Sequence, residues 1–336
     1  MILGLDIGGA NTKAASADGK YAQSVYLPLW KRPPLEKILK RINAEQKPEA
    51  VAVVITGELA DCFSSKREGL ESIMAAVCRA FSSPAFPCPV YFWGYSGFRG
   101  RDIEEPTDQA DILDIAAANW SASAELLARE LGDCLFVDMG STTTDLIPIL
   151  ARPLAAKNDF LRLSRGELVY MGLLRTNLNS ILPLARIRGQ QVPVAPELFA
   201  IIADAHLASG HIDPDRYTCD TPDGTDVSRI SSLRRLARSV CADLEEIGER
   251  GALAIAEQAC IEQKNRLMAA IERQAELHRL ERVAAAGIGE ELIAEAATRL
   301  GLDCILLSEL YGSRISDLFP AYAAARLLET DPVYLR

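Results

Sequence analysis

The stretch DIGGANTK, Asp6 to Lys13, directly follows the apolar run MILGL. A second stretch, VDMGSTTTD, runs from Val137 to Asp145 and begins with the last residue of the apolar run CLFV. Each places an Asp at the end of a predicted strand, a glycine two residues later and a threonine six residues later, Thr12 and Thr144. The same turn therefore occurs twice, more than a hundred residues apart. This repeat decides the fold prediction.

Each Asp-x-Gly turn is expected to open a β-hairpin that begins a new half of the chain. Residues 1–30 are predicted as a β-meander, with Asp18-Gly19 as a hairpin turn. Residues 133–140 and 143–151 are predicted as the second hairpin. Helical patterns follow both hairpins. They are expected over 111–132, around 172–182 and 195–209, and over most of 228–300.

The composition excludes several classes of protein. The chain has 336 residues and a net charge of −10, whereas a general nucleic-acid binder is usually basic. We find no apolar run of about 20 residues, the length needed to span a bilayer, and no export segment at the N-terminus. The eight cysteines show no metal-ligand spacing. We therefore expect a cytoplasmic protein without a nucleic-acid or membrane partner, and the sequence does not indicate an oligomeric state.

Both turns carry the groups that hold phosphate. A glycine-rich turn after a strand points successive backbone N–H groups at one place, and glycine lets the backbone approach a ligand closely. Hydroxyl, amide and ammonium side chains add donors. The residues expected to bind phosphate or diphosphate are Gly8, Gly9, Asn11, Thr12 and Lys13 in the first turn, and Gly140, Ser141, Thr142 and Thr143 in the second.

Carboxylates at the same strand ends indicate a magnesium site. Asp6 and Asp138 end the two strands, and Asp145 lies at the far end of the second turn. Mg²⁺ in proteins is held by one or two carboxylates and keeps most of its waters. These three residues are the predicted metal ligands. The alternative is that both stretches are ordinary turns, since Asp-x-Gly is common.

The segment from Ile55 to Gly69 follows a predicted buried strand and is unusually charged. It contains Glu58, Asp61, Lys66 and Arg67. Loops after buried strands are where α/β proteins place their sites. A plain helix N-terminus with acidic residues in its first turn would give the same pattern.

Two further groups of residues are candidates for a substrate-binding loop and for a metal site. Tyr170 and Arg175 lie in a Gly-rich stretch that is a candidate substrate-binding loop, or else a strand–turn–helix connection. His206 and His211 are five residues apart, a spacing that does not stack them on one helical face. A plain helix end closed by Gly210 is therefore preferred to a metal site there.

The order of the motifs resembles the actin, Hsp70 and sugar-kinase superfamily. The two Asp-x-Gly turns correspond to its phosphate positions, and AAAGIGEELIAEAA, from Ala284 to Ala297, to its adenosine position, which adds Gly287 and Gly289 to the phosphate-binding set. The resemblance implies an α/β fold with two RNase-H-like lobes around a phosphate-binding cleft. The lobes would be residues 1–120 with 313–336 returning, and residues 121–312.

A narrower resemblance covers nearly the whole chain. The segments LDIGGANTK, TGELADCFSSKREG, VDMGSTTTDLIPI, GELVYMG and GIGE look like those of hydantoinase/oxoprolinase-like proteins tied to tetrahydromethanopterin-linked C1 transfer. Members of this group of proteins serve methanofuran or methylofuran biosynthesis. The resemblance implies a transferase that joins an (aminomethyl)furan-methyl diphosphate to the phenol oxygen of tyramine, γ-glutamyltyramine or tyrosine, and releases diphosphate.

This reaction assigns roles to the charged residues. Glu58 or Asp61 would take the phenol proton, with Asp6 also in the catalytic set, and Lys66 or Arg67 would place an acidic end of the acceptor. The sequence does not rank Glu58 against Asp61. Mg²⁺ is the expected cofactor.

Two other functions compete. The adenosine-position turn would suit an ATP-dependent kinase or an oxoprolinase-like or hydantoinase-like hydrolase. A non-catalytic pathway regulator with this fold is the second alternative. Selective binding of ATP rather than diphosphate would favour the first alternative.

Overall fold

The computed structural model describes residues 1–82, 88–99 and 114–331. The chain divides into two compact units. The first unit comprises Met1–Phe136, Ile147–Glu167 and Ile305–Arg336, and the second comprises Val137–Leu146 and Leu168–Cys304. The lobes expected from the sequence, 1–120 with 313–336 and 121–312, are a different division, and they stay a prediction.

The first sheet has six strands in the order β3-β2-β1-β4-β5-β6. A meander, β1 to β3, is followed by two parallel additions: β4 pairs with β1, and β5 pairs with β4. The last strand, β6, runs antiparallel to β5. The strands are β1 (Ile2–Gly8), β2 (Asn11–Ser16), β3 (Ala22–Tyr26), β4 (Ala50–Thr56), β5 (Val90–Gly94) and β6 (Gly97–Arg99).

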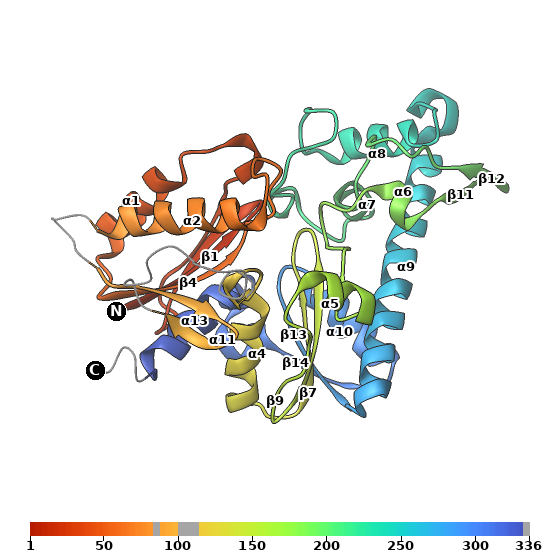
Figure 1. The fold of residues 1–336 in the computed structure, drawn as a ribbon. Coiled ribbons are helices and arrows are strands. Elements are labelled where there is room, and N and C mark those ends of the chain that lie inside the picture. The colour runs from red at the N-terminus through yellow and green to blue at the C-terminus, as the bar shows by residue number, and fades with distance from the viewer. Residues whose placement is uncertain (83–87, 100–113, 332–336) are drawn as a thin grey trace. The chain divides into compact units, whose positions relative to one another are not determined.

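Helices cover both faces of this sheet (Figure 1). Leu3, Leu5 and Ile7 alternate along β1 and pack into one core cluster with α1 (Leu35–Gln46) and α2 (Lys66–Phe81). On the opposite face α13 (Phe319–Glu329) lies so close that a Cβ on Gly4 would be 1.7 Å from the Ala321 carbonyl oxygen. Among the described residues of the first unit, the other helices are η1 (Leu29–Lys31), α4 (Asn119–Glu130), α5 (Asp159–Arg165), α11 (Leu307–Tyr311) and α12 (Ser313–Ser316).

The second sheet repeats the order of the first. Its path is β10-β8-β7-β13-β14, and β9 pairs with β8 off this path. Numbered along these paths, with β9 left out, the second sheet reads third, second, first, fourth and fifth strand, and the first sheet has the same order with β6 added as a sixth strand. This shared order confirms the predicted α/β fold with two RNase-H-like halves. The strands are β7 (Cys134–Met139), β8 (Thr144–Leu150), β9 (Arg152–Pro153), β10 (Leu168–Val169), β13 (Arg282–Ala286) and β14 (Asp303–Leu306).

The second unit also contains a separate two-stranded sheet and a group of packed helices. In the long helix α9 the backbone of Gly248 is not helical. The elements are α6 (Leu178–Ile181), β11 (Leu184–Ile187), β12 (Gln190–Pro193), α7 (Ile202–Ser209), η2 (Pro214–Arg216), α8 (Arg229–Arg238), α9 (Leu244–His278) and α10 (Glu290–Arg299).

Several predicted helices differ from those observed. The helix expected around 172–182 is reduced to α6, and that around 195–209 to α7. The helical pattern over 228–300 is expected to break at AAAGIGEE, residues 284–291, and β13 is a strand that begins two residues before this break. Of the helix expected over 111–132, residues 111–113 lie outside the described residues, and α4 begins only at Asn119. None of the helices among the described residues combines the length and apolar character needed to cross a bilayer.

Candidate active site

The first glycine turn joins β1 to β2 and is tightly constrained. The N–H of Gly57 donates to the Ile7 carbonyl (2.9 Å), and the N–H of Leu29 donates to the Gly9 carbonyl (2.8 Å). A Cβ on Gly8 would lie 2.9 Å from the Asn11 carbonyl oxygen, whereas a Cβ on Gly9 would meet nothing within 4 Å. The backbone of the turn is therefore fixed, and the space beside Gly9 is open to a ligand.

Oxygen atoms suited to a hard cation lie at this strand end. Asp6 is 5% exposed, and the Thr56 hydroxyl lies 3.5 Å from its Oδ1. On β2, Asn11 and Lys13 are half-buried and Thr12 is buried, as the alternation of a strand requires. The Thr12 hydroxyl is buried and has no hydrogen-bond partner among the described residues. A carboxylate with nearby hydroxyls fits Mg²⁺ chemistry, although the buried Thr12 is less accessible than its two neighbours.

Glu58 is a buried ionisable group of the first unit. It comes two residues after β4, is 1% exposed, and its Oε2 has no hydrogen-bond partner within the described ranges. Burial raises the pKa of Glu58 to about 7. Its own backbone N–H and the charge of Lys66 counteract this shift, and Asp159 adds to it. A carboxyl with such a pKa can accept a proton near neutral pH.

The electrostatic environment of Glu58 includes a residue distant in the sequence. The charge of Asp159, on α5, acts on the pKa values of Glu58 and Tyr95. Asp159 also pairs with Arg162 (3.0 Å), and the buried Arg162 guanidinium stacks 4.6 Å from the Trp120 ring centroid. The sequence analysis missed this group, because no local pattern connects residues about 100 positions apart.

The other predicted residues of the charged segment lie around the start of α2. The hydroxyl of Ser65 caps the helix by accepting the N–H of Glu68. Lys66 is close enough to lower the pKa of Glu58, whereas Arg67 pairs with Glu71 at 3.7 Å. Asp61 is exposed. The structure therefore associates Glu58 with Lys66 and leaves Asp61 on the surface.

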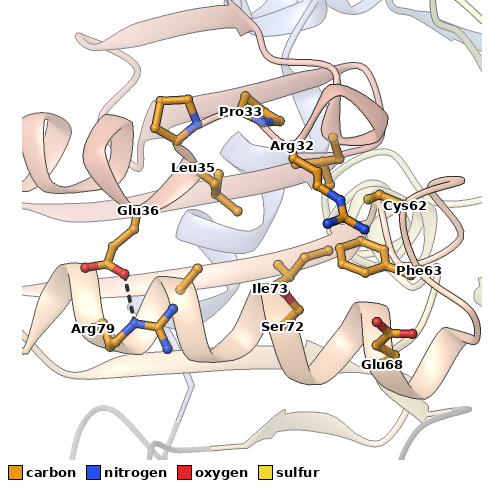
Figure 2. Close-up of a pocket in the computed structure, with 13 residues that line it drawn as sticks. Arg32, Pro33, Leu35, Glu36, Cys62, Phe63, Glu68, Ser72, Ile73 and Arg79 are labelled. Atoms are coloured by element: carbon orange, nitrogen blue, oxygen red, sulfur yellow. Dashed lines mark hydrogen bonds and ion pairs between the residues drawn. The ribbon is translucent and has the colours of Figure 1, made fainter.

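A cavity of about 460 Å³ lies between the start of α1 and the length of α2, within the first unit. Leu29, whose N–H holds the Gly9 carbonyl, lines it. Figure 2 shows the Glu36–Arg79 pair (2.8 Å) at one end and Arg32 near Phe63 at the other. None of the predicted site residues is among those that line it.

The second glycine turn, between β7 and β8, is held by a neighbouring segment. The N–H groups of Leu173 and Arg175 donate to the carbonyls of Gly140 (2.9 Å) and Ser141 (2.8 Å). The Arg175 guanidinium donates to the Thr142 hydroxyl (3.2 Å). The structure thus brings predicted phosphate-binding residues of the turn together with the predicted substrate residue Arg175.

Gly172 shows how close this packing is. A Cβ on Gly172 would lie 2.4 Å from the Thr142 nitrogen. The Thr144 hydroxyl donates to the Met171 carbonyl (2.6 Å), so it supports the same segment rather than facing a ligand. Thr143 is half-buried in the turn. Tyr170, the other predicted substrate residue, is 69% exposed.

The third glycine motif packs on the end of β7. A Cβ on Gly287, whose φ is 86°, would lie 2.3 Å from Asp138 Oδ1, and a Cβ on Gly289 would lie 2.4 Å from the Met139 sulfur. Arg216, from the polar loop before α8, donates to the Ile288 carbonyl (3.1 Å). Sequence analysis missed Arg216, although its loop was recognisable as polar. Asp138 and Asp145 are both half-buried near the turn, and their oxygens suit Mg²⁺.

The strand order and the glycine turns at the strand ends define an α/β protein of the duplicated RNase-H-like class. The hydantoinase/oxoprolinase family, Hydantoinase_A, matches residues 49–331. The chain belongs to this family.

Two relatives with the same name support this assignment. The (4-{4-[2-(γ-L-glutamylamino)ethyl]phenoxymethyl}furan-2-yl)methanamine synthase of Methanocaldococcus jannaschii is 37% identical over 334 residues, which covers 98% of both chains. The synthase of that name from Methanococcus vannielii is 32% identical over 214 residues, 62% of this chain and 96% of the relative. Among solved structures, a ROK family glucokinase from Streptomyces griseus aligns over 97% of this chain and 98% of its own, with a TM-score of 0.47 and 15% identity.

Proposed function

We propose that this chain is an aryl-ether-forming transferase. It joins a furan-methyl diphosphate to the oxygen of a phenol and releases diphosphate. The observation that carries the proposal is the 37% identity, over 98% of both chains, to a synthase whose named product contains a phenoxymethyl group on a furan. The sites described above suit this reaction.

The reaction needs one bond to form and one to break. The phenol oxygen attacks the furan methylene carbon, and the bond from that carbon to the diphosphate oxygen breaks, with the electron pair leaving on diphosphate. The phenol proton goes to a protein base. A free phenol has a pKa of about 10, so it is a poor nucleophile at neutral pH without such a base.

Glu58 is the base that we favour over Asp61. It is buried, it carries an oxygen without a hydrogen-bond partner in the part of the chain that the structure describes, and its pKa is raised to about 7. Asp61, in contrast, is exposed. Lys66, which acts electrostatically on Glu58, is placed to attract a carboxylate of the acceptor.

The glycine turns are the proposed binding sites for phosphate oxygens. In the first unit the open side of Gly9, with Asn11 and Lys13, would donate to them. In the second unit the donors would come from residues 140–143 and Arg175. Donors fixed before the reaction stabilise charge that grows on a leaving oxygen.

Magnesium is the proposed cofactor. The proposed magnesium ligands of each unit separately are Asp6 in the first unit, and Asp138 and Asp145 in the second. When bound, Mg²⁺ supplies positive charge that stabilises a diphosphate leaving group.

The test is a direct assay with synthetic (aminomethyl)furan-methyl diphosphate, Mg²⁺ and each candidate phenol, with the ether detected by mass spectrometry and diphosphate by phosphorus NMR. We expect stoichiometric ether and diphosphate, with one of γ-glutamyltyramine, tyramine and tyrosine preferred in kcat/KM. Absence of the ether with all three phenols would contradict the proposal.

A binding experiment distinguishes the proposed transferase from an ATP-dependent kinase or hydrolase. We expect Mg²⁺ with diphosphate to raise Tm more than Mg²⁺ with ATP at equal concentration, because ligands that bind only the folded state stabilise it. Stabilisation by ATP alone would favour a kinase or hydrolase.

A further inference from the structure

Three side chains in the second unit gather where no part of the proposed reaction needs them. His206 on α7, His211 after α7 and Cys260 on α9 each offer one ligand atom, and these atoms lie within 4.8 Å of one another. His206 and Cys260 are buried, and His211 is exposed. Cys260 is not part of a disulfide.

The end of α7 explains why two histidines five residues apart can meet. Gly210 adopts the left-handed conformation (φ 74°) and closes the helix, and the N–H of His211 donates to the His206 carbonyl (2.9 Å). This reversal folds His211 back over the last helical turn. The two ring centroids are therefore 5.5 Å apart.

Two of the three distances between the ligand atoms are close to those of a tetrahedral metal site, and all three are within 4.8 Å. The two Nδ1 atoms are 3.4 Å apart, and the Cys260 sulfur lies 3.7 Å from His206 Nδ1. Zn–N bonds of about 2.0–2.1 Å and Zn–S bonds of about 2.3 Å at tetrahedral angles place two nitrogens about 3.3–3.4 Å apart and a nitrogen and a sulfur about 3.5–3.6 Å apart. The observed distances are close to both values.

A hydrogen bond from His206 to Gln263 determines which nitrogen of His206 can bind a metal together with His211 and Cys260. The amide nitrogen of Gln263 donates to the Gly172 carbonyl (2.9 Å). The side-chain oxygen of Gln263 therefore faces His206 Nε2 (2.7 Å). That oxygen only accepts, so Nε2 carries the proton and Nδ1 carries the lone pair. Metal-binding histidines typically donate their other N–H to such a partner.

The charge states of the ligands are also informative. Burial lowers the pKa of His206 to about 4, so its imidazole is neutral and can coordinate at neutral pH. Burial raises the pKa of Cys260 to about 12, while the Ser209 hydroxyl and the Lys264 charge act in the opposite direction. A metal would have to displace the thiol proton, so its binding should strengthen as pH rises.

We propose that His206, His211 and Cys260 form a binding site for a late first-row divalent metal of the zinc type, with solvent as the fourth ligand on the exposed side of His211. Two nitrogens and a thiolate suit Zn²⁺ and exclude Mg²⁺ as the natural occupant. This site is independent of the proposed transferase reaction and of its magnesium.

The test uses the full chain, stripped of metal by a chelator and titrated with Co²⁺ as a spectroscopic substitute for Zn²⁺. We expect one equivalent to bind, with the visible bands of tetrahedral Co²⁺ and a near-ultraviolet thiolate charge-transfer band, and Zn²⁺ to displace it. Cys260→Ser should remove the charge-transfer band, and His211→Ala should weaken Co²⁺ binding at least 10-fold.

The chain offers matched controls for both variants. His278→Ala removes the third histidine of the chain, and Cys241→Ser removes an exposed thiol, so neither should change the titration. Because His211 is exposed, His211→Ala is expected to fold even if Cys260→Ser does not. A titration without the charge-transfer band, or one that His211→Ala leaves unchanged, would overturn the proposal.

Discussion

Gly69 of α2 packs directly against the backbone of Glu58, so that a Cβ at position 69 would lie 2.1 Å from the Glu58 carbonyl oxygen. The position of the proposed base thus depends on a glycine in the first turns of the following helix. No flexible side chain lies at this contact, since the three nearest atoms all belong to the Glu58 backbone.

Gly69→Ala should therefore move Glu58. We expect a loss of about 1–3 kcal/mol of stability from overpacking, and a fall in kcat/KM on the order of 10²-fold because small displacements of catalytic groups are costly. Thermal unfolding and ether formation measure the two effects. Ser72→Ala, at an exposed position of the same helix, is the control, and equal activity of both variants would contradict the role given to Gly69.

Glu58→Gln removes the proposed base while keeping its shape. We expect kcat to fall about 10²–10⁴-fold, the usual contribution of a general base. In the unmodified protein kcat/KM should fall as pH drops below about 7, the pKa of Glu58. In the variant this dependence should disappear. Asp61→Asn should keep both activity and pH profile, and the reverse pattern would make Asp61 the base.

The raised pKa of Glu58 also predicts how stability depends on pH. The folded protein holds this proton up to about pH 7, whereas a free Glu releases it near 4.5. The contribution of Glu58 to the free energy of unfolding is therefore fully present below pH 4.5 and is lost as the pH rises through about 7. The shift corresponds to about 3 kcal/mol. Relative to the unmodified protein, Glu58→Gln should gain stability between pH 4.5 and pH 7.5 in urea unfolding, while Asp61→Asn should not.

Much of the fold could be predicted from the sequence, because both halves begin with strong β patterns. The N-terminal meander, β4, β7 and β8 lie where the sequence places them. The predictions were wrong where tertiary packing overrides local preference. The alanine-rich β13 has a helical composition, yet Val283 to Ala286 are fully buried within the sheet. The β11–β12 hairpin turns at Arg188-Gly189, both with positive φ, without the usual Asn-Gly or Asp-Gly signal.

The candidate site, like the fold, has parts that the sequence predicts and parts that depend on tertiary packing. Local motifs identified the glycine turns and the charged segment, since their function depends on neighbouring residues. The sequence could not rank Glu58 against Asp61, because burial is decided by packing against Gly69 and its surroundings. Nor could it bring Cys260 to His206, from which it is 54 residues distant.

The contact between Arg175 and the second glycine turn gives the last prediction. Arg175 donates to the Thr142 hydroxyl (3.2 Å), and its backbone N–H holds the Ser141 carbonyl. Removing a charged hydrogen-bond donor costs about 1.5–3 kcal/mol, so Arg175→Ala should weaken diphosphate binding about 10–100-fold, measured by calorimetry. The backbone contact survives this change, so the fold and Tm should be little affected.

The control for Arg175→Ala is Arg250→Ala, which removes an exposed cation from α9 in the same unit. It makes the same change in net charge, so it separates a local contact from general electrostatic attraction. Arg175→Lys adds a further distinction, because an ammonium keeps the charge but not the planar set of donors. If Arg175 acts through its fixed contact with Thr142, the lysine variant should bind diphosphate more weakly than the unmodified protein. Equal loss in the Arg175 and Arg250 alanine variants would show instead that only total charge matters.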